Sequence, residues 1–409
     1  MSGQRAAAEP YATRFESQVT AVDGRRVWLD SSHFFAESGG QPADRGTVGD
    51  VPVADVVLED GEHVHVLEEE PSFSEGHRVL CSIDWSFRMY CMRAHTASHV
   101  CYGAARRVLG EVGYAGLEIG EEMVRVELET DEELDDDALV SLDELVNRAV
   151  WESRPVSWDS MPVADAREAD EVVLTERTEG SAFSKGRVRV VTIGDVDEGG
   201  ASAVNVSSQP WDAAACGGTH VRNTREIGPV TVLGRTEADA GRAGVELAVG
   251  PRAIERRETE KRVTFAASRQ LGVPLAEATG KLSTLEAERE ALADSVGTLQ
   301  RELVKTRLES AEPFEREGRT WVGTTAGVVD ANEAGEVARD LAGELADVIV
   351  IAGEEDSPFA VVATGEDADA ETILRDLTDE FGGGGGGSAR LAWGGDFDVD
   401  PEAVLSGLE

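Results

Sequence analysis

The stretch WSFRMYCMRAHTASHVCYGAARRVL, residues 85–109, predicts a long helix around which the rest of the chain can be organised. Its apolar residues recur at helical spacing, and neither glycine nor proline interrupts it before Gly103. Asp84 is a suitable N-cap residue, and Gly110 suits the position just after the last turn. We therefore expect one continuous helix between these two residues.

The predicted helix carries two histidines, His95 and His99, four positions apart. Residues at this spacing leave a helix on the same face, about 5–6 Å apart at Cβ, so both rings can reach one ion. Taken alone, the pair fits two ordinary helix histidines better than a metal clamp, because the pattern is short and common.

A second pair, Cys216 and His220, lies in the stretch WDAAACGGTHV, residues 211–221. The two glycines between them disfavour a helix but allow a tight turn that folds the thiol and the imidazole to one point. Three imidazoles and one thiolate are a ligand set that zinc favours. The helix pair lacks the glutamate of the HExxH motif, so a zinc peptidase is not expected.

Composition and charge set the broad class of the protein. The chain has 409 residues, 41% of them hydrophobic, which is enough for two or three domains with their own cores. Its formal net charge of −42 is spread along the sequence, as in proteins adapted to very high salt, and does not exclude a nucleic-acid partner. No apolar run approaches the roughly 20 residues that cross a membrane. Four cysteines make a poor disulfide framework, so we expect a protein of the reducing cytoplasm.

The predicted elements indicate an α+β fold. Residues 1–83 form a small β-rich, barrel-like module with a hairpin turn at Asp23 and the glycine after it. Residues 84–250 contain the histidine helix, further strands and an amphipathic helix, and form the core with the metal site. Residues 251–317 predict helices with a coiled-coil stripe, interrupted at LGVP, and residues 318–409 predict a small α/β domain.

Three segments, in order, resemble the hallmarks of a known editing domain. They are HFFAESGGQPADRGTV at residues 33–48, AHTASHV at 94–100 and CGGTHV at 216–221. They are similar to the editing domain of alanyl-tRNA synthetase and to its free-standing relatives, the AlaX proteins. The stretch GGGGGGSARLAWGG, residues 382–395, resembles the DHH-associated C-terminal domain of the synthetase. Because the β-rich module starts almost at Met1, the chain looks like the long form of AlaX.

The resemblance implies a hydrolase that acts in trans, without ATP, on mischarged transfer RNA and so protects translation fidelity. The implied substrate is Ser-tRNA(Ala), with Gly-tRNA(Ala) as a second candidate. By the same resemblance, zinc is held by His95, His99, Cys216 and His220, which would also be the catalytic centre. Four protein ligands ordinarily close a zinc ion, so either one ligand is loose, the ion takes a fifth ligand, or it mainly anchors the substrate's amino group.

Five residues are implied on the substrate side of the site. Gly39 and Gly40 would let the backbone approach the terminal adenosine, and Gln41 would offer an amide for hydrogen bonding. The alternative for this segment is a simple tight turn. The hydroxyls of Thr96 and Thr219 are candidates for sensing serine, although both residues also fit local hydrogen-bonding roles.

Binding of transfer RNA needs cationic contacts, and arginine can grip phosphate bidentately. The candidates lie around the two pairs: Arg88, Arg93, Arg106, Arg107, Arg222 and Arg225. The alternative for each is an ion pair with one of the many carboxylates. The C-terminal domain is implied to contact the tRNA elbow and, together with the coiled coil, to form a homodimer.

Two departures from the family pattern bear on substrate choice. Glu118 stands in a segment where the family often carries a glutamine, and residues 197–215 look like an insertion before Cys216. These departures and the four-ligand count leave a second hypothesis open, a noncatalytic tRNA-binding protein that a structural zinc stabilises. A DHH-type phosphoesterase is disfavoured, because the sequence has no Asp-His-His motif.

Overall fold

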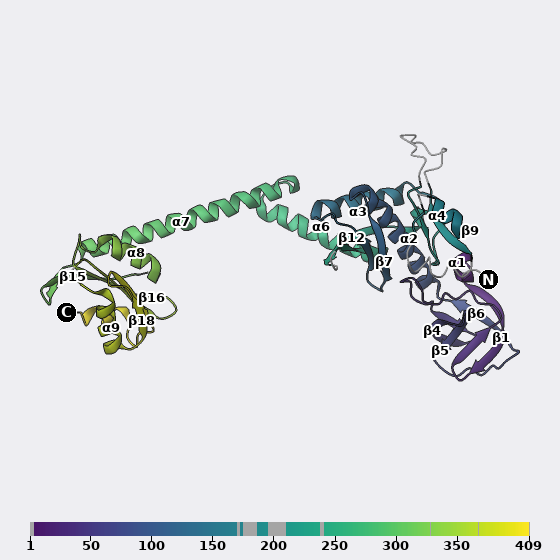
Figure 1. The fold of residues 1–409 in the computed structure, drawn as a ribbon, viewed down its shortest axis with the longest axis horizontal. Helices are drawn as coiled ribbons and strands as arrows, with labels where there is room; N and C mark the ends of the chain where they lie inside the picture. Colours follow the sequence, from purple (N-terminus) through teal and green to yellow (C-terminus); the bar gives the residue numbers. More distant parts are fainter. Residues whose placement is uncertain are drawn as a thin grey trace. The chain divides into compact units, whose positions relative to one another are not determined.

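The computed structural model describes residues 4–169, 172–174, 186–194, 210–237, 241–327, 329–366 and 368–408. The chain forms two compact units, Met1–Phe265 and Ala266–Glu409, and the helices and strands of each are labelled in Figure 1. Among the described residues, none of the helices combines the length and the hydropathy needed to pass through a bilayer.

A closed β-barrel opens the first unit. It follows the short helix α1 (Arg5–Ala8), and its strand order is β1-β2-β5-β4-β3-β6. The strands are β1 (Arg14–Asp23), β2 (Arg26–Leu29), β3 (Gly46–Val48), β4 (Val51–Glu59), β5 (Glu62–Leu67) and β6 (Arg78–Ile83). Asp23 pairs with Arg26 across a turn in which Gly24 has φ 57°, so the predicted hairpin and barrel-like module are confirmed.

The predicted histidine helix is α2 (Trp85–Val108). The Asp84 side chain accepts hydrogen bonds from the backbone N–H groups of Ser86 and Phe87, and Gly110 has φ 84° just beyond the helix, so both predicted ends are confirmed. From Cys91 to Ala105 every residue of the helix except Arg93 is buried. A helix that is buried on all faces must be packed on several sides, and this position makes α2 the centre of the unit.

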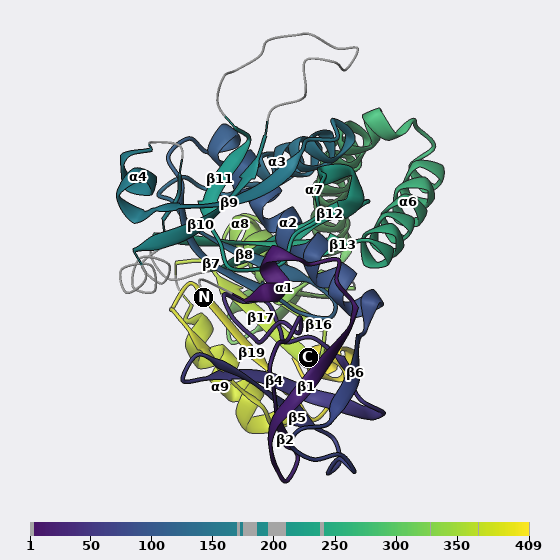
Figure 2. The same cartoon turned by 90° about the vertical axis from the view of Figure 1, so that its right-hand side faces the viewer.

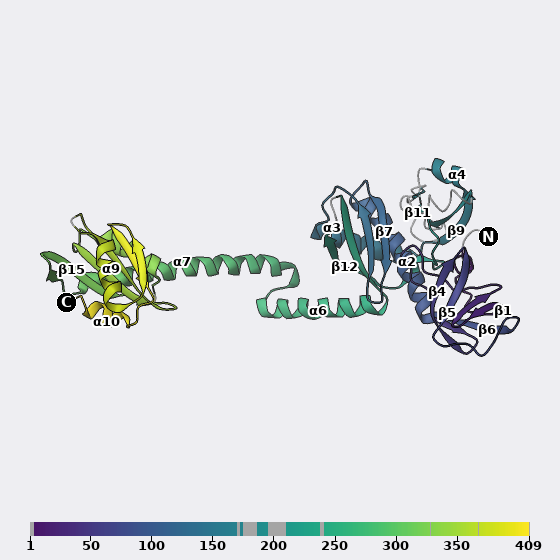
Figure 3. The ribbon, with the colours of Figure 1, turned by 60° about the horizontal axis from the view of Figure 1, so that its bottom comes forward.

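Two antiparallel sheets and two further helices surround α2. The four-stranded sheet has the order β12-β13-β8-β7, and the three-stranded sheet has the order β11-β10-β9 (Figures 2 and 3). The elements are β7 (Gly113–Ile119), β8 (Val124–Glu129), α3 (Asp136–Trp151), β9 (Val156–Pro162), α4 (Val163–Glu168), β10 (Arg187–Ile193), β11 (Asp212–Ala215), η1 (Thr224–Ile227), β12 (Val230–Glu237) and β13 (Arg242–Val249). One apolar cluster joins α2 and α3 to both sheets, and the mixture confirms the α+β class.

The chain passes to the second unit within α6 (Pro251–Leu271). The predicted interruption at LGVP is present, because Gly272 has φ 68° and the short turn η2 (Leu275–Glu277) follows Pro274. The next helix, α7 (Ala278–Ser310), has 33 residues, and its leucine stripe is exposed in this single chain. Pairing of that stripe in a coiled coil therefore stays a prediction, as do the three predicted domain boundaries.

A six-stranded sheet with helices on both faces forms the body of the second unit. Its order is β14-β15-β16-β17-β19-β18, and among these described strands only β15 and β16 pair in parallel. The elements are β14 (Phe314–Arg316), β15 (Arg319–Thr325), α8 (Ala331–Leu341), β16 (Val348–Glu354), β17 (Pro358–Thr364), α9 (Ala370–Phe381), β18 (Gly384–Gly387), β19 (Leu391–Gly395) and α10 (Pro401–Ser406). One face packs on α8 and the other on α9 and α10. The glycine run is thus folded as an edge strand.

Candidate metal centre

The four residues of the two predicted pairs meet in the first unit. His95 and His99 come from α2, and Cys216 and His220 come from the turn that follows β11. One ligand atom from each side chain lies within 4.8 Å of the others; the three histidines are buried, and Cys216 is partly exposed. The predicted convergence of two segments more than 100 positions apart is therefore confirmed.

The nitrogens that face the centre are the Nε2 atoms. The Sγ atom of Cys216 lies 3.3 Å from Nε2 of His95 and 3.2 Å from Nε2 of His220. The rings of His95 and His99 are stacked with their centroids 5.6 Å apart, as expected for an i, i+4 pair on one helix face. The thiol and the imidazoles thus surround a single point.

The Nδ1 atom of each ring faces an acceptor outside the cluster. Nδ1 of His99 lies 2.8 Å from Oδ2 of the fully buried Asp212, and Nδ1 of His95 lies 3.0 Å from Oε1 of Gln41. Nδ1 of His220 lies 3.2 Å from Oγ1 of Thr96.

The Thr96 hydroxyl donates its own proton to the Met92 carbonyl, so its oxygen is left to accept from His220. A carboxylate, an amide oxygen and this hydroxyl oxygen can all accept a proton from Nδ1. These contacts select the tautomer that leaves the Nε2 lone pair free toward the centre, which is the usual arrangement around a metal-bound histidine.

Glycine is required inside the Cys216 turn. A Cβ atom on Gly218 would collide with the His95 ring and approach Oε1 of Gln41. The next residue, Thr219, donates its backbone N–H to Gln41 Oε1 at 3.0 Å and accepts from Gln41 Nε2 at 2.9 Å through its hydroxyl. The turn therefore packs directly against a histidine ligand and against the amide that orients it.

The protonation preferences of the cluster pair a thiolate with a protonated His99, and a cation at the centre would take the place of the Nε2 proton of that ring. Burial would raise the pKa of the Cys216 thiol, but the adjacent His95 and His220 rings outweigh it and lower the pKa well below the ordinary value. Burial lowers the pKa of His220 to about 3. For His99, hydrogen bonds with Asp212 and Cys216 overcome burial and raise the pKa to about 10. The cluster thus favours a thiolate beside a neutral His220.

This donor set fits a metal ion. Three imidazole nitrogens with fixed tautomers and one sulfur that favours the thiolate are the ligands that borderline divalent ions prefer. The outer acceptors Gln41, Thr96 and Asp212 complete the support expected of such a site. The cluster could therefore hold a metal ion.

A cavity of about 370 Å³ lies against one side of the cluster. His95, His99 and Cys216 line it, whereas His220 is fully buried. Other walls come from the glycine turn at Ser38 and from strands β7 and β8. A small molecule in this cavity would therefore meet the cluster on the side of three of its four ligands.

The predicted substrate-side residues divide into two groups. Gly39 lines the cavity, and Gly40 packs against the Leu117 carbonyl, which a Cβ atom would overlap. Approach of these glycines to the terminal adenosine stays a prediction. The side chains of Gln41, Thr96 and Thr219 are fully buried and bond to the cluster residues or to each other. These bonds support the histidines, and contact of the three side chains with substrate stays a prediction.

The predicted phosphate contacts also divide. Arg88 is fully buried and its guanidinium pairs with Asp44, so its predicted contact with tRNA is wrong. Arg106 pairs with Asp212 at 3.1 Å, and Arg107 lies over the Trp211 ring, 4.0 Å from its centroid.

Arg93 donates to the backbone oxygen of Glu226 at 2.7 Å. Arg222 and Arg225 are exposed. Phosphate contact by Arg93, Arg106, Arg107, Arg222 and Arg225 stays a prediction.

Two features of the site were not predicted from the sequence. Asp212 orients His99, and its signal was an acidic residue in an otherwise alanine-rich strand, DAAA. Tyr114, packed edge-on against Tyr102, lines the cavity. Glu118, which departs from the family pattern, is exposed and lies 3.6 Å from Arg125. The predicted insertion, residues 197–215, falls mostly outside the described residues.

Comparison with known proteins gives two family matches. Residues 188–244 match the Threonyl and Alanyl tRNA synthetase second additional domain, and residues 5–87 match tRNA synthetases class II (A). These ranges contain the turn with Cys216 and the barrel with Gln41.

Similar full-length proteins are alanine–tRNA ligases. The Pyrococcus abyssi ligase is 30% identical over 97% of this chain and 42% of its own length, and the Methanopyrus kandleri ligase is 32% identical over 91% and 40%. The chain thus spans about two fifths of the length of these relatives. The C-Ala domain of Aquifex aeolicus alanyl-tRNA synthetase is 24% identical, covering 24% of this chain and 94% of that one, at a TM-score of only 0.22.

Proposed function

Because this chain is a relative of the alanyl-tRNA synthetases along nearly its whole length, we propose that it is a trans-acting editing hydrolase of the AlaX type. It removes serine, and glycine as a second substrate, from tRNA(Ala) by hydrolysing the ester to the terminal adenosine. The observation that carries this proposal is the convergence of His95, His99, Cys216 and His220 beside a cavity. We expect it to act in the cytoplasm.

Zinc is the metal that we propose for the cluster, held by those four residues. When bound, zinc can polarise an ester carbonyl and lower the pKa of water from 15.7 toward ~7. The protein's own contribution is to fix the ligands. Gln41, Thr96 and Asp212 each hold one imidazole by its Nδ1 atom, so the Nε2 atoms need no rearrangement when substrate arrives.

The cavity supports a small aminoacyl ester as the substrate. Its volume of about 370 Å³ lies at the lower end of ordinary ligand sites. Gly39 and Gly217 line it without side chains, so the terminal nucleoside can lie against backbone. The cluster side of the cavity then receives the aminoacyl group, next to His95, His99 and Cys216.

A second candidate is a noncatalytic tRNA-binding protein with a structural zinc. The number of protein ligands favours it, because four of them ordinarily complete the coordination of zinc. The cavity on the side of three ligands favours the hydrolase, because a purely structural site needs no access for a small molecule.

The deacylation assay separates the two candidates. Purified protein in molar KCl is incubated with Ser-tRNA(Ala), Gly-tRNA(Ala) and Ala-tRNA(Ala), and ester loss is compared with buffer alone. The hydrolase predicts accelerated loss of serine, slower or comparable loss of glycine, and sparing of alanine. Binding of tRNA(Ala) without acceleration of any ester would instead establish the second candidate.

Cys216→Ala tests whether the metal takes part in the reaction. We expect zinc content to fall to near zero and deacylation to fall by at least about 100-fold, since the thiolate ligand is lost. Cys91→Ala is the control, because Cys91 is buried in the same helix region but lies outside the cluster. Full activity of Cys216→Ala without metal would remove zinc from the mechanism.

We further propose that two copies pair through α7 and the C-terminal domain. Seven positions of α7 follow the heptad spacing of three and four residues: Leu282, Leu285, Arg289, Leu292, Val296, Leu299 and Leu303. The six apolar members are 39–69% exposed. A stripe of this length buries its leucines when a second helix lies along it, and a second copy supplies the same stripe.

A further inference from the structure

We propose that the N-terminal segment, residues 4–11, is a strap that positions the two loops of the cavity, with Gln4 and Arg189 as its positioning residues. The strap contains α1 and lies outside the metal cluster. Its contacts reach the glycine turn on one side of the cavity and the Cys216 turn on the other. The inference rests on the proposed function only for the identity of the molecule that the cavity binds.

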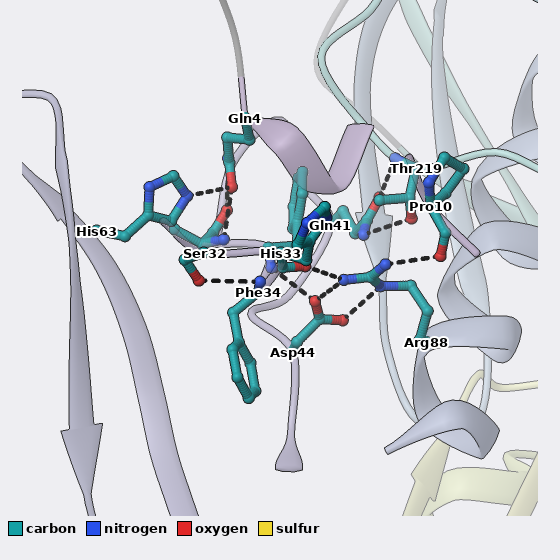
Figure 4. Close-up of polar contacts among 12 residues, drawn as sticks. Gln4, Pro10, Ser32, His33, Phe34, Gln41, Asp44, His63, Arg88 and Thr219 are labelled. Carbon is teal, nitrogen blue, oxygen red and sulfur yellow. Dashed lines mark hydrogen bonds and ion pairs between the residues drawn. The ribbon is translucent and has the colours of Figure 1, made fainter. Parts of the chain in front are cut away.

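Gln4 fastens the strap to the glycine turn. Its Nε2 donates to the Ala36 carbonyl at 2.9 Å and to Ser38 Oγ at 3.3 Å, while its Oε1 accepts from the Ala36 N–H at 2.7 Å. Figure 4 shows the same amide next to the His63 ring, whose Nε2 lies 3.1 Å from Gln4 Oε1. The side chain pairs with the backbone of Ala36 as a neighbouring β-strand would.

The glycine turn links the Gln4 contacts to the wall of the cavity. Ser38 and Gln41 exchange both backbone hydrogen bonds, at 3.2 and 3.1 Å, which closes a tight turn around Gly39 and Gly40. Ser38 and Gly39 line the cavity, and the Gln41 side chain holds His95 and Thr219. Gln4 therefore sets the position of a cavity wall without touching a metal ligand.

Arg189 fastens the strap to the Cys216 turn. Its Nη1 donates to the Cys216 carbonyl at 2.7 Å and its Nη2 donates to the Ala7 carbonyl at 2.9 Å, so one guanidinium bridges the strap and a ligand residue. The backbone adds a third bond, from Cys216 N–H to the Arg189 carbonyl at 3.0 Å. The planar fork of arginine can make both carbonyl contacts together, whereas a lysine ammonium is a single point donor.

Two more contacts fix the remainder of the strap. Pro10 presents its carbonyl to Arg88 Nη1 at 2.8 Å (Figure 4). Tyr11 donates its hydroxyl to Glu226 Oε2 at 2.6 Å. Ala6 and Ala7 are buried between these anchors. The strap thus contacts the barrel, the Cys216 turn, α2 and η1, and it ties the two loops together in addition to the direct bonds between Gln41 and Thr219.

Gln4→Met is the main test, because methionine keeps the length of the side chain and removes every hydrogen bond. We expect the Ala36 amide and the neighbouring 36–41 turn to exchange their hydrogens at least about tenfold faster. Zinc content should not change. For the serine ester, KM should rise about tenfold with a smaller change in kcat, because the wall moves while the ligands stay.

Gln18→Met is the matched control for that variant. Gln18 is an exposed barrel glutamine with a single 3.4 Å contact to the Gly76 carbonyl, so its loss should change neither exchange in the turn nor KM. If Gln4→Met changes neither the hydrogen exchange of the 36–41 turn nor KM, the proposal that the strap positions the cavity wall is wrong. If the wild-type protein cleaves no ester, the proposed function fails, and the exchange measurement still decides the strap.

Arg189→Lys tests the other end and keeps the charge near Cys216. We expect faster exchange of the Cys216 amide and of the strap residues, and a loss of about tenfold in kcat/KM. Arg187→Lys is its control, since Arg187 lies two residues earlier on the same strand and its guanidinium donates to the side chain and the carbonyl of Ser160. If the two lysine variants show the same hydrogen exchange and the same kcat/KM, Arg189 is not a positioning residue.

Discussion

At the scale of single residues, the cluster depends on the acceptor behind each imidazole. Asp212 is the one ionised acceptor among the three, and it is fully buried between His99 and Arg106. A charged acceptor makes the hydrogen bond from Nδ1 stronger and the Nε2 lone pair more basic. The contribution of His99 to metal affinity should therefore depend on this carboxylate.

Asp212→Asn keeps the size of the side chain and removes its charge. We expect the affinity for zinc to fall by about 10- to 100-fold, measured by competition with a chelator of known affinity, and the proposed deacylation to fall with it. Asp159→Asn, on the exposed edge of strand β9, is the control. Equal metal affinity in both variants would show that the Asp212 charge does not support the ligand.

The ligand set was predictable from the sequence, but its support was not. Spacing alone places His95 and His99 on one helix face, and the two glycines let Cys216 and His220 fold together. The residue types of Gln41 and Thr96 do not reveal whether the amide and the hydroxyl face the substrate or a histidine of the cluster. Their direction is set by packing between the barrel, α2 and the Cys216 turn, and no local pattern contains that information.

At the scale of elements, the barrel contains a histidine that is kept neutral. Nδ1 of His65 lies 3.1 Å from the Val27 carbonyl, which can only accept, so Nε2 accepts from the Ser32 hydroxyl at 2.8 Å. Burial lowers the pKa of His65 to about 4 from the ordinary 6.5. Adding a proton to Nε2 would place two donors against each other in the buried barrel.

This pKa predicts that acid destabilises the barrel. Between pH 6.5 and pH 4 the unfolded chain binds a proton that folded His65 does not, so the stability present above pH 6.5 is lost as the pH falls. The loss amounts to about 3 kcal/mol for a shift of this size. Unfolding of the full chain in urea, at constant molar KCl, measures it.

His65→Asn removes this titration and should reduce the pH dependence by about 3 kcal/mol, even where its stability at neutral pH is lower. The remaining slope would come from other groups such as His33, His63 and His220, whose pKa burial also lowers. His77→Asn, at an exposed position of the same module, should keep the wild-type slope. A wild-type slope in His65→Asn would assign the acid sensitivity to other groups.

The long helix α7 gives the second prediction at this scale. Leu292 is 65% exposed in the middle of the heptad stripe, so Leu292→Glu should place a carboxylate inside the proposed coiled coil and convert a dimer to a monomer. Ala293→Glu, exposed on the neighbouring face, should remain dimeric. Light scattering at several concentrations measures both, and a wild-type monomer throughout would contradict the assembly.

The elements themselves were predicted where local chemistry defines them. The N-cap at Asp84, the hairpin at Gly24 and the break before Pro274 all follow from residues that favour one backbone conformation. Strand β18 is the opposite case, because Gly384–Gly387 has no side chain that favours a strand. Its pairing with β19 comes from the tertiary structure. The resemblance to a folded domain predicted only that the glycine run is part of that domain.

At the scale of the whole molecule, the net charge of −42 is the dominant property. The Debye length falls from about 8 Å at 0.15 M salt to about 3 Å at 1 M, so the repulsion among carboxylates is largely screened in molar KCl. We expect the thermal unfolding midpoint to rise by at least about 10 °C between about 0.2 M and about 2 M KCl.

A neutral osmolyte separates screening from general stabilisation of compact states. Sucrose at matched water activity should raise the midpoint much less than KCl does, because it does not screen charge. An equal rise in both would show that self-repulsion does not limit the stability of this protein.

Arg88 lies in α2, but its side chain bonds to residues that come before the helix in the chain. Its guanidinium contacts Asp44 and the carbonyls of His33 and Pro10, and none of it is exposed. Suppose that recombination just before residue 84 joined this helix to the barrel of a related protein. Arg88 would then be buried without a carboxylate partner, unless the new barrel carried an acidic residue at the position of Asp44. Recombination among relatives should therefore exchange the barrel and the histidine helix as one inherited block.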